Sequence, residues 1–472
     1  MRGTSWRSKL CGAGGSPARS LPQAPHDHKN PEHRSPPLAA QAQPPDYTCT
    51  VSARAPGKSV TLALCLPPSP SGLPVSHPAH RPIAIKRIRR ALGWAIVGVF
   101  SALGVLSLWP DLLTPISPSL RLSTSYPFAQ MLALRSGLLV GIGVIALILL
   151  TSAAVRFYRK EGGHRTLTLA IVLALVAVSH GVVLAQRGLS GSQPTKASAV
   201  ADPTAWDGTV TVLSFNTLYE GTSVVTLAQT IRDLSPEVIV LLETGPEYGQ
   251  QLAELLQEDG HAFSVFTATT AQPTDAEATT TPTPEATATP TPSKAGAKKK
   301  KHHGTAEETT VLVSAALGNY EQKPAPANLG FGAVMLSPTG DSVTGKLRPT
   351  ILGVHTLPPV GNYMAPWRDQ LTKVAAQCQA GTMPAGLIMA GDLNATLDNG
   401  PLRQLGACAD AGVQAGIGGL ATWPTSSHTQ LLGASIDHVL IDQASWRARA
   451  GSIMDLPGSD HRAVMVDLEP TS

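Results

Sequence analysis

The stretch IMAGDLNATLD, residues 388–398, says most about the fold of this chain. An apolar run reaches Gly391, and then Asp392 and Asn394 follow two residues apart. A short apolar run bounded by turn-forming residues predicts a buried strand. Two interpretations of the polar pair stay open at this point. It could form a turn, since Asp and Asn favour such positions, or it could hold a cation or a phosphate, since a buried carboxylate is costly without a partner.

Apolar runs of the same kind alternate with helical patterns from residue 209 onward. Strands are predicted at 209–218, 238–244, 332–338, 349–357, 385–394, 436–442 and 462–469, and helices at 223–237, 248–259 and 365–380. Strands mixed with helices in this way predict a layered α/β domain over residues 206–472.

One segment of this domain breaks the pattern. Residues 269–310 are rich in Thr and Pro and end in a Lys/His run. This composition cannot bury a core, which predicts a disordered insert between two strands. The run KKKKHH at 298–303 is interpreted as a solvated charge run, with binding to an anionic surface or a metal as the alternative.

The N-terminal part of the chain carries three long apolar runs. Residues 1–84 lack periodicity and are predicted to be disordered, or to begin upstream of the true start. In the region 85–187, the runs at 91–109, 136–155 and 166–186 each have the ~20 residues that cross a bilayer. A small-residue linker at 188–205 follows.

Basic residues predict the orientation of these three runs. They gather at 86–90 before the first run and at 156–165 between the second and third, whereas the intervening loop has only Arg121, plus Arg135 at its edge. Because cytoplasmic loops are enriched in Lys and Arg, the chain is predicted to be a multi-pass protein of the cell membrane. Its N-terminus is then cytoplasmic and its C-terminal domain extracytoplasmic. The runs contain few polar residues, so we interpret them as an anchor rather than a transport path.

The charge of the two halves differs in sign. The first 205 residues carry a net charge of +15 and the remainder −11, within a total of +4. An acidic domain is a poor general binder of nucleic acid but can hold a divalent cation. Cys378 and Cys408 fall in the acidic half, where a disulfide and two free buried thiols both remain open.

Polar residues recur where the predicted strands of the C-terminal domain end or begin. Loops at strand ends are where rigid scaffolds carry catalytic groups, so we expect these residues to converge. Carboxylates and amides suit Mg²⁺ or Mn²⁺, and histidines beside carboxylates can move protons. The set is Asn216, Glu243, His355, Asp392, Asn394, Asp437, Asp460 and His461. His438, next to Asp437, points to the opposite side of its strand and is predicted to be structural. Trp367 and Trp423 are predicted packing residues, with a place in the lining of the substrate cleft as the alternative for either.

The motifs that carry these residues resemble the endonuclease/exonuclease/phosphatase superfamily, whose fold is DNase I-like. In order they are SFNTL (214–218), LLET (241–244), GVHTLPP (353–359), GDLNAT (391–396), IDHVL (436–440) and GSDHRAV (458–464). The resemblance covers about residues 209–469 and implies a four-layer α/β sandwich in a membrane-anchored, bacterial-type member. Leu242 stands where the family usually has Gln, which bears on substrate contacts rather than on the metal.

The resemblance also implies roles for single residues. Glu243, Asn216 and Asp460 are similar to the metal-holding residues. Asp392 resembles the acid that activates water, and Asn394 resembles a donor to the phosphate. His461 resembles a general base or phosphate contact, Asp437 the acid that orients it, and His355 the histidine that stabilises the phosphate or leaving group.

Together these observations predict a membrane-anchored, Mg²⁺- or Mn²⁺-dependent phosphoesterase that cleaves a phosphodiester or phosphomonoester. Its substrate would be a lipid headgroup, a small phosphodiester or nucleic acid, and the acidic domain and membrane tether favour the first two. The alternative is a non-catalytic binding module of the same fold. No protein partner is predicted.

Overall fold

The computed structural model describes residues 53–55, 58–60, 81–192, 206–269, 306–326, 329–342 and 344–471. Apart from residues 53–55 and 58–60, the predicted disorder before residue 81 lies outside the described residues. So do the residues between 270 and 305 and the linker from 193 to 205. The chain divides into two units, Met1–Ala79 and His80–Ser472. In the first unit, β1 (Ala53–Ala55) pairs antiparallel with β2 (Lys58–Val60).

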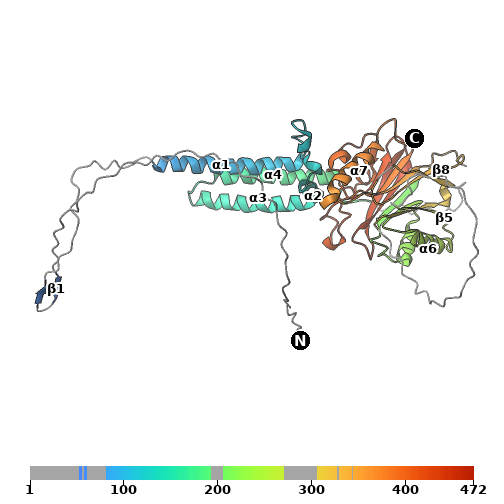
Figure 1. Ribbon diagram of the computed structural model, residues 1–472, viewed down its shortest axis with the longest axis horizontal. Helices are drawn as coiled ribbons and strands as arrows, with labels where there is room; N and C mark the ends of the chain where they lie inside the picture. Colours follow the sequence, from blue (N-terminus) through green and yellow to red (C-terminus); the bar gives the residue numbers. More distant parts are fainter. Residues whose placement is uncertain are drawn as a thin grey trace, which may run out of the picture. The chain divides into compact units, whose positions relative to one another are not determined.

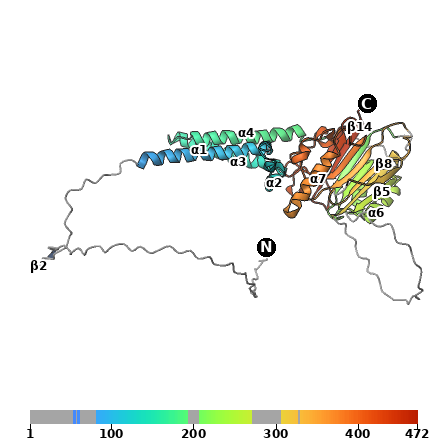
Figure 2. The ribbon, with the colours of Figure 1, turned by 45° about the horizontal axis from the view of Figure 1, so that its top comes forward.

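Three helices at the start of the second unit are long and apolar enough to cross a membrane, as the sequence predicts. They are α1 (Arg81–Leu108), α3 (Arg135–Tyr158) and α4 (His164–Arg187), and they lie side by side (Figures 1 and 2). Each contains a stretch that is mostly Leu, Ile, Val and Ala, with many apolar side chains exposed, whereas α1 also carries the exposed basic residues at 86–90. The short helix α2 (Phe128–Ala133) and the 3-10 turns η1 (Pro118–Leu120) and η2 (Leu122–Thr124) form the segment between α1 and α3.

Two six-stranded sheets form the C-terminal domain. One has the order β13-β14-β3-β4-β6-β5 and the other β11-β12-β10-β9-β8-β7. The strands are β3 (Val210–Asn216), β4 (Val238–Leu242), β5 (Phe263–Thr269), β6 (Glu308–Ser314), β7 (Tyr320–Lys323), β8 (Ala333–Pro338), β9 (Thr350–His355), β10 (Leu387–Asp392), β11 (Cys408–Asp410), β12 (Asp437–Asp442), β13 (Trp446–Asp455) and β14 (Arg462–Pro470).

The sheets pack face to face, and helices cover both outer sides. These helices are α5 (Val224–Leu234), α6 (Pro246–Gln257) and α7 (Met364–Ala376). The short helix α8 (Ala411–Gln414) contacts strands of both sheets, and its Ala411 belongs to the core between them. The 3-10 turns are η4 (Ala315–Leu317), η5 (Gly361–Tyr363), η6 (Gly400–Arg403) and η7 (Thr425–Ser427). Figure 1 shows α6 and α7 on opposite sides of the sheets. This is the predicted four-layer α/β sandwich.

The two-residue period of the strands explains why both sheet faces are apolar. Along β4, Val238, Val240 and Leu242 belong to the core between the sheets. The alternate residues Ile239 and Leu241 pack with α5 and α6. A third core joins the second sheet to α7. Strands buried on both faces read as continuous apolar runs, which is how the sequence presents them.

The C-terminal domain also contacts the segment between the apolar helices. Asp398 accepts hydrogen bonds from Arg135 Nε at 2.8 Å and from Arg187 Nη1 at 2.9 Å, so it joins the start of α3 to the end of α4. Gln130 of α2 donates to the carbonyl of Pro359, and Ala129 packs in the same core as Leu393. The apolar helices are therefore tied to the loops that follow β9 and β10.

A disulfide joins Cys378, just after α7, to Cys408 at the start of β11. The sequence left this pairing open. The structure also places the C-terminal boundary of the predicted insert before residue 308 instead of at 310, because Glu308–Thr310 belong to β6 and pair with β5.

Candidate active site

The sheet topology brings the predicted site residues to one end of the sandwich. β3 runs parallel to β4, and β9 runs parallel to β10, so the carboxyl ends of each pair lie together. β12 and β14 run antiparallel to β10 and β3, so their first residues reach the same end. In register, Asp392 pairs with both His355 and Asp437.

Asn216 is the link between the two sheets at this end. Its Nδ2 lies 3.1 Å from Glu243 Oε1 and 3.3 Å from Asp392 Oδ2. All three side chains are buried. Its Oδ1 accepts from the backbone N–H of Leu218 at 3.0 Å, which fixes the orientation of the amide. Asn216 therefore holds an acid from each sheet in place.

The backbone around Glu243 is shaped for this contact. Glu243 has φ = 57°, a left-handed conformation that L residues rarely adopt. Its second oxygen, Oε2, accepts from the backbone N–H of Tyr219 at 3.1 Å. Backbone strain of this kind persists where the surrounding structure enforces it, which is common at functional sites.

Asp460 enters the site from the loop before β14. Its Oδ2 accepts from the indole N–H of Trp423 at 2.9 Å, while its buried Oδ1 has no hydrogen-bond partner. Such an unpaired buried carboxylate oxygen is costly unless a ligand meets it. Trp423, predicted as a packing residue, is partly exposed and positions this acid.

Two histidines face Asp392. His355 Nε2 lies 3.6 Å and His461 Nε2 3.7 Å from Asp392 Oδ2. On its other side, His461 Nδ1 lies 2.9 Å from Asp437 Oδ2, so Asp437 fixes the orientation of the imidazole. Asp437 and Asp392 thus flank His461, as the predicted roles require of an orienting acid and its histidine.

Asn394 is held beside this group. Asp392 Oδ1 accepts from the backbone N–H of Asn394 at 2.8 Å, and Asn394 Nδ2 donates to the carbonyl of Thr356 at 2.8 Å. The left-handed φ of 44° at Asn394 allows this tight turn. One N–H of the half-buried amide is used internally, which leaves the other for a ligand.

Burial and neighbouring charges separate the pKa values of these groups. Burial and the charge of Asp437 raise the pKa of Asp392 to about 7. Burial opposes protonation of His461, but the charges of Asp437 and Asp392 outweigh it and raise its pKa to about 10. Burial and the charge of His461 lower the pKa of His355 to about 3. At neutral pH, His461 is therefore the charged histidine and His355 the neutral one.

The residues fit a divalent cation. Burial raises the pKa of Glu243, as expected of a carboxylate desolvated without a counter-ion. Glu243, Asn216 and Asp460 offer hard oxygen ligands, and Asp460 Oδ1 is free to bind. A second group, Asp392, Asp437 and His461, has ligand atoms all within 4.8 Å of one another. The hydrogen bond between Asp437 and His461 already satisfies part of that second group, which makes the first group the better candidate for a cation.

Two other predicted residues stand apart from the site. His438 is buried with its Nδ1 2.7 Å from Asp410 Oδ2 and its Nε2 2.9 Å from the carbonyl of Ala395, so its role is structural. Trp367 is fully buried in the core beneath α7.

A comparison with protein families identifies the domain. The profile described as the Endonuclease/Exonuclease/phosphatase family matches residues 213–461, which is more than half of the chain. The chain belongs to this family. Members hydrolyse phosphoesters and typically depend on a divalent metal. The matched residues include every position of the site described above.

Several solved structures are similar to the chain, although no curated protein matches it. An endonuclease/exonuclease/phosphatase from Beutenbergia cavernae is 18% identical, covers 56% of this chain and 72% of its own, and has a TM-score of 0.38. The human Nocturnin catalytic domain with bound sulfate is 15% identical over 57% of this chain and 95% of its own, with a TM-score of 0.37. At these scores the assignment rests on the family match alone.

Proposed function

We propose that this protein is a membrane-anchored, Mg²⁺- or Mn²⁺-dependent phosphoesterase whose catalytic domain lies outside the cytoplasm. The observation that carries the proposal is the buried group at one end of the sandwich. There, Asn216 joins Glu243 to Asp392, and Asp392 faces two oriented histidines.

Each side chain of the site has its own role in the proposed hydrolysis. Asp392, whose pKa of about 7 lies near neutral pH, accepts a proton from the attacking water. His461 is held charged by Asp437 and stabilises negative charge on the phosphate, which is the second of its two predicted roles. Asn394 and His355 bind the phosphate and the leaving group. A divalent cation held by Glu243, Asn216 and Asp460 would act as a Lewis acid on the phosphate oxygens.

Exposed apolar side chains around this end favour a lipid phosphoester as substrate. Among the described residues from 206 onward, only two exposed large apolar side chains lie away from this end of the sandwich, and they are Val225 and Leu347. The others lie on the loops that surround the site: Tyr219, Val360, Tyr363, Trp423, Leu431 and Leu432. A nucleic-acid site would instead be rimmed by Lys and Arg.

The same loops approach the apolar helices. Gly433, next to Leu432, exchanges hydrogen bonds with Ser136 at the start of α3. Pro359, next to Val360, accepts from Gln130 of α2. If the helices cross the bilayer, the rim of the site therefore lies close to its surface. The Cys378–Cys408 disulfide supports the extracytoplasmic side, because disulfides persist in oxidising compartments.

The test uses the full chain in detergent micelles with Mg²⁺, Mn²⁺ or EDTA. Bis-p-nitrophenyl phosphate, plasmid DNA and a phospholipid panel serve as substrates. We expect metal-dependent cleavage, strongest on a phospholipid, that is lost in Asp392→Ala and His461→Ala. It should be retained in His428→Asn, an exposed histidine outside the site.

Metal binding provides a second readout. Calorimetry should detect Mn²⁺ binding that Glu243→Gln weakens. A folded protein that binds neither Mg²⁺ nor Mn²⁺ would refute the site. Metal binding without turnover on any substrate would favour the binding-module alternative.

A further inference from the structure

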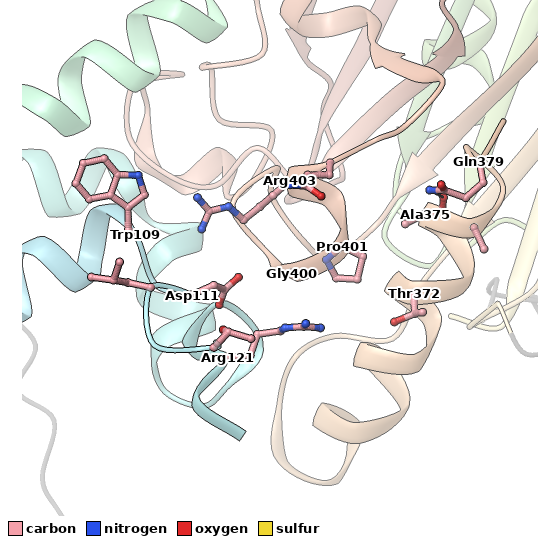
Figure 3. Close-up of a pocket in the computed structure, with 13 residues that line it drawn as sticks. Trp109, Asp111, Arg121, Thr372, Ala375, Gln379, Gly400, Pro401 and Arg403 are labelled. Atoms are coloured by element: carbon pink, nitrogen blue, oxygen red, sulfur yellow. Dashed lines mark hydrogen bonds between the residues drawn. The ribbon is translucent and has the colours of Figure 1, made fainter. Parts of the chain in front are cut away.

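A cavity of about 710 Å³ lies between the segment after α1 and the outer side of the catalytic domain (Figure 3). One wall is formed by residues 109–121, and the other by α7 and η6. The volume falls in the range of small-molecule sites, roughly 300–1,000 Å³. None of the proposed catalytic or metal-holding residues lines it, so it is distinct from the active site.

Two arginines project into this cavity from opposite walls. Arg121 comes from the segment after α1 and Arg403 from η6, as Figure 3 shows. Both are exposed, and neither guanidinium group has a hydrogen-bond or ion-pair partner in the part of the chain that the structure describes. Two unpaired guanidinium groups on one cavity form a site for an anion, because each presents a fork of N–H donors that matches phosphate oxygens.

The one acid in the cavity offsets only one of the two arginine charges. Asp111 is the only acidic residue in the lining, and both of its oxygens are used by Ser123. Its Oδ1 accepts from the backbone N–H at 3.1 Å and its Oδ2 from the hydroxyl at 2.7 Å. The lining therefore keeps a net positive charge. Thr372 of α7 and Gln379, three residues after its end, add neutral polar groups to the opposite wall.

The cavity lies at the end of the apolar helices. The apolar part of α1 ends at Leu108, and Trp109 is both the next residue and a lining residue. Trp is enriched where a membrane meets water. Leu112 and Ile116 of the same segment are also exposed. On the other wall, η6 begins two residues after Asp398, which binds the ends of α3 and α4.

We propose that this cavity binds the phosphate-bearing headgroup of an anionic membrane lipid. Arg121 and Arg403 would hold the phosphate between them, Thr372 and Gln379 would contact the polar headgroup, and the acyl chains would extend along the exposed apolar surface of α1. The inference rests on the proposed membrane placement of α1 and not on the proposed reaction.

Such a lipid would act as a bridge. Arg121 belongs to the segment between the apolar helices, whereas Arg403 belongs to the loop that continues from Asp392 and Asn394. A phosphate that binds both would stabilise the contact between the membrane region and the catalytic loop. Anionic lipid should therefore raise the melting temperature of the whole chain.

The experiment uses the full chain in neutral detergent, titrated with short-chain phosphatidylglycerol, short-chain phosphatidylcholine or inorganic phosphate. Bound lipid is counted by native mass spectrometry, and the melting temperature is followed by tryptophan fluorescence. The test variant is Arg121→Gln/Arg403→Gln. The matched control is Arg447→Gln. Arg447 is an exposed arginine of β13 that forms an ion pair with Glu469 of β14.

We expect phosphatidylglycerol to bind at least fivefold more tightly than phosphatidylcholine and to raise the melting temperature. The double variant should lose one bound lipid and the thermal shift, while Arg447→Gln keeps both. The variant Arg121→Lys/Arg403→Lys retains the charge and should recover part of the lipid binding. That recovery would show that the glutamine double variant does not lose the lipid through misfolding.

Two results would overturn the proposal. One is equal lipid binding and an equal thermal shift in the wild type and the double variant. The other is inorganic phosphate giving the same shift as phosphatidylglycerol at equal concentration, which would make this a site for free anions. Asp392→Ala should bind lipid like the wild type, so a failure of the proposed reaction would leave this result unchanged.

Discussion

Asp398 should be among the most sensitive positions of the chain outside the active site. Its carboxylate is buried and receives hydrogen bonds from both Arg135 and Arg187. Burial alone would raise the pKa of Asp398, but the two guanidinium groups outweigh this and hold it at about 2, against an ordinary value of 3.8. Asp398→Asn removes the charge and leaves two arginines without their partner.

Two estimates bracket the loss of stability. The lowered pKa of Asp398 corresponds to roughly 2 kcal/mol of stabilisation. Removing one partner of a buried ion pair costs about 3–5 kcal/mol in other proteins, because the remaining charge stays buried. Since each kcal/mol shifts the melting temperature of a domain of this size by about 2–4 °C, Asp398→Asn should lower it by roughly 4–20 °C.

The assay is tryptophan fluorescence during heating of the full chain in detergent at pH 7. There the stabilisation is fully present, since it is lost only as the pH falls from about 4 towards 2. Asp369→Asn is the matched control, because Asp369 forms an exposed ion pair with Lys373 at 2.7 Å. Such a pair contributes only about 0.3–0.5 kcal/mol. Equal melting temperatures for the two variants would refute the reasoning.

Three further predictions test the site and the sheets. Asp437→Asn should lower kcat by roughly 10²–10⁴-fold, since His461 loses the partner 2.9 Å away that orients it. Calorimetry should show unchanged Mn²⁺ binding, and a loss of binding would move the cation to Asp392, Asp437 and His461. Burial raises the pKa of Glu237 to about 7, so the wild type loses stability as the pH rises from 4.5 to 7, by about 3 kcal/mol. Glu237→Gln should remove that slope and melt higher at pH 8 but not at pH 5, and parallel curves would contradict the assignment. Gly391→Ala should abolish the folded protein recovered in detergent, because its Cβ would lie 1.8 Å from the carbonyl oxygen of Val354; a melting temperature equal to that of the wild type would show that this backbone tolerates a side chain.

The central strands could be predicted from the sequence, because a strand that is buried on both faces appears as a continuous run of apolar residues. β3, β4, β10 and β12 lie within the predicted ranges. β13 was missed. It alternates exposed arginines with small alanines over Trp446–Ala450, and small residues carry little hydrophobic signal. β6 was missed as well, because its first residues continue the composition of the insert, and so were β5, β7 and β11.

The site residues could be found from the sequence because each one ends or begins a strand. The side chains that pair with these and neighbouring residues could not be found from the sequence. Trp423 reaches Asp460 across 37 positions of sequence, and Asp410 reaches His438 across 28. Neither pair has a local pattern, since tertiary packing alone brings them together. The pairing of Asp398 with two helix ends more than 200 residues away was invisible for the same reason.

The place of β14 in its sheet constrains how the protein is made. This late strand lies inside the sheet, between β13 and β3, and the two residues before it are Asp460 and His461. Its partner β3 is synthesised about 250 residues earlier, so the sheet cannot close, nor can the site form, until β14 has also been synthesised. An exported domain of this kind would cross the membrane unfolded and remain inactive throughout. The cytoplasm would therefore be exposed to no hydrolytic activity from the growing chain.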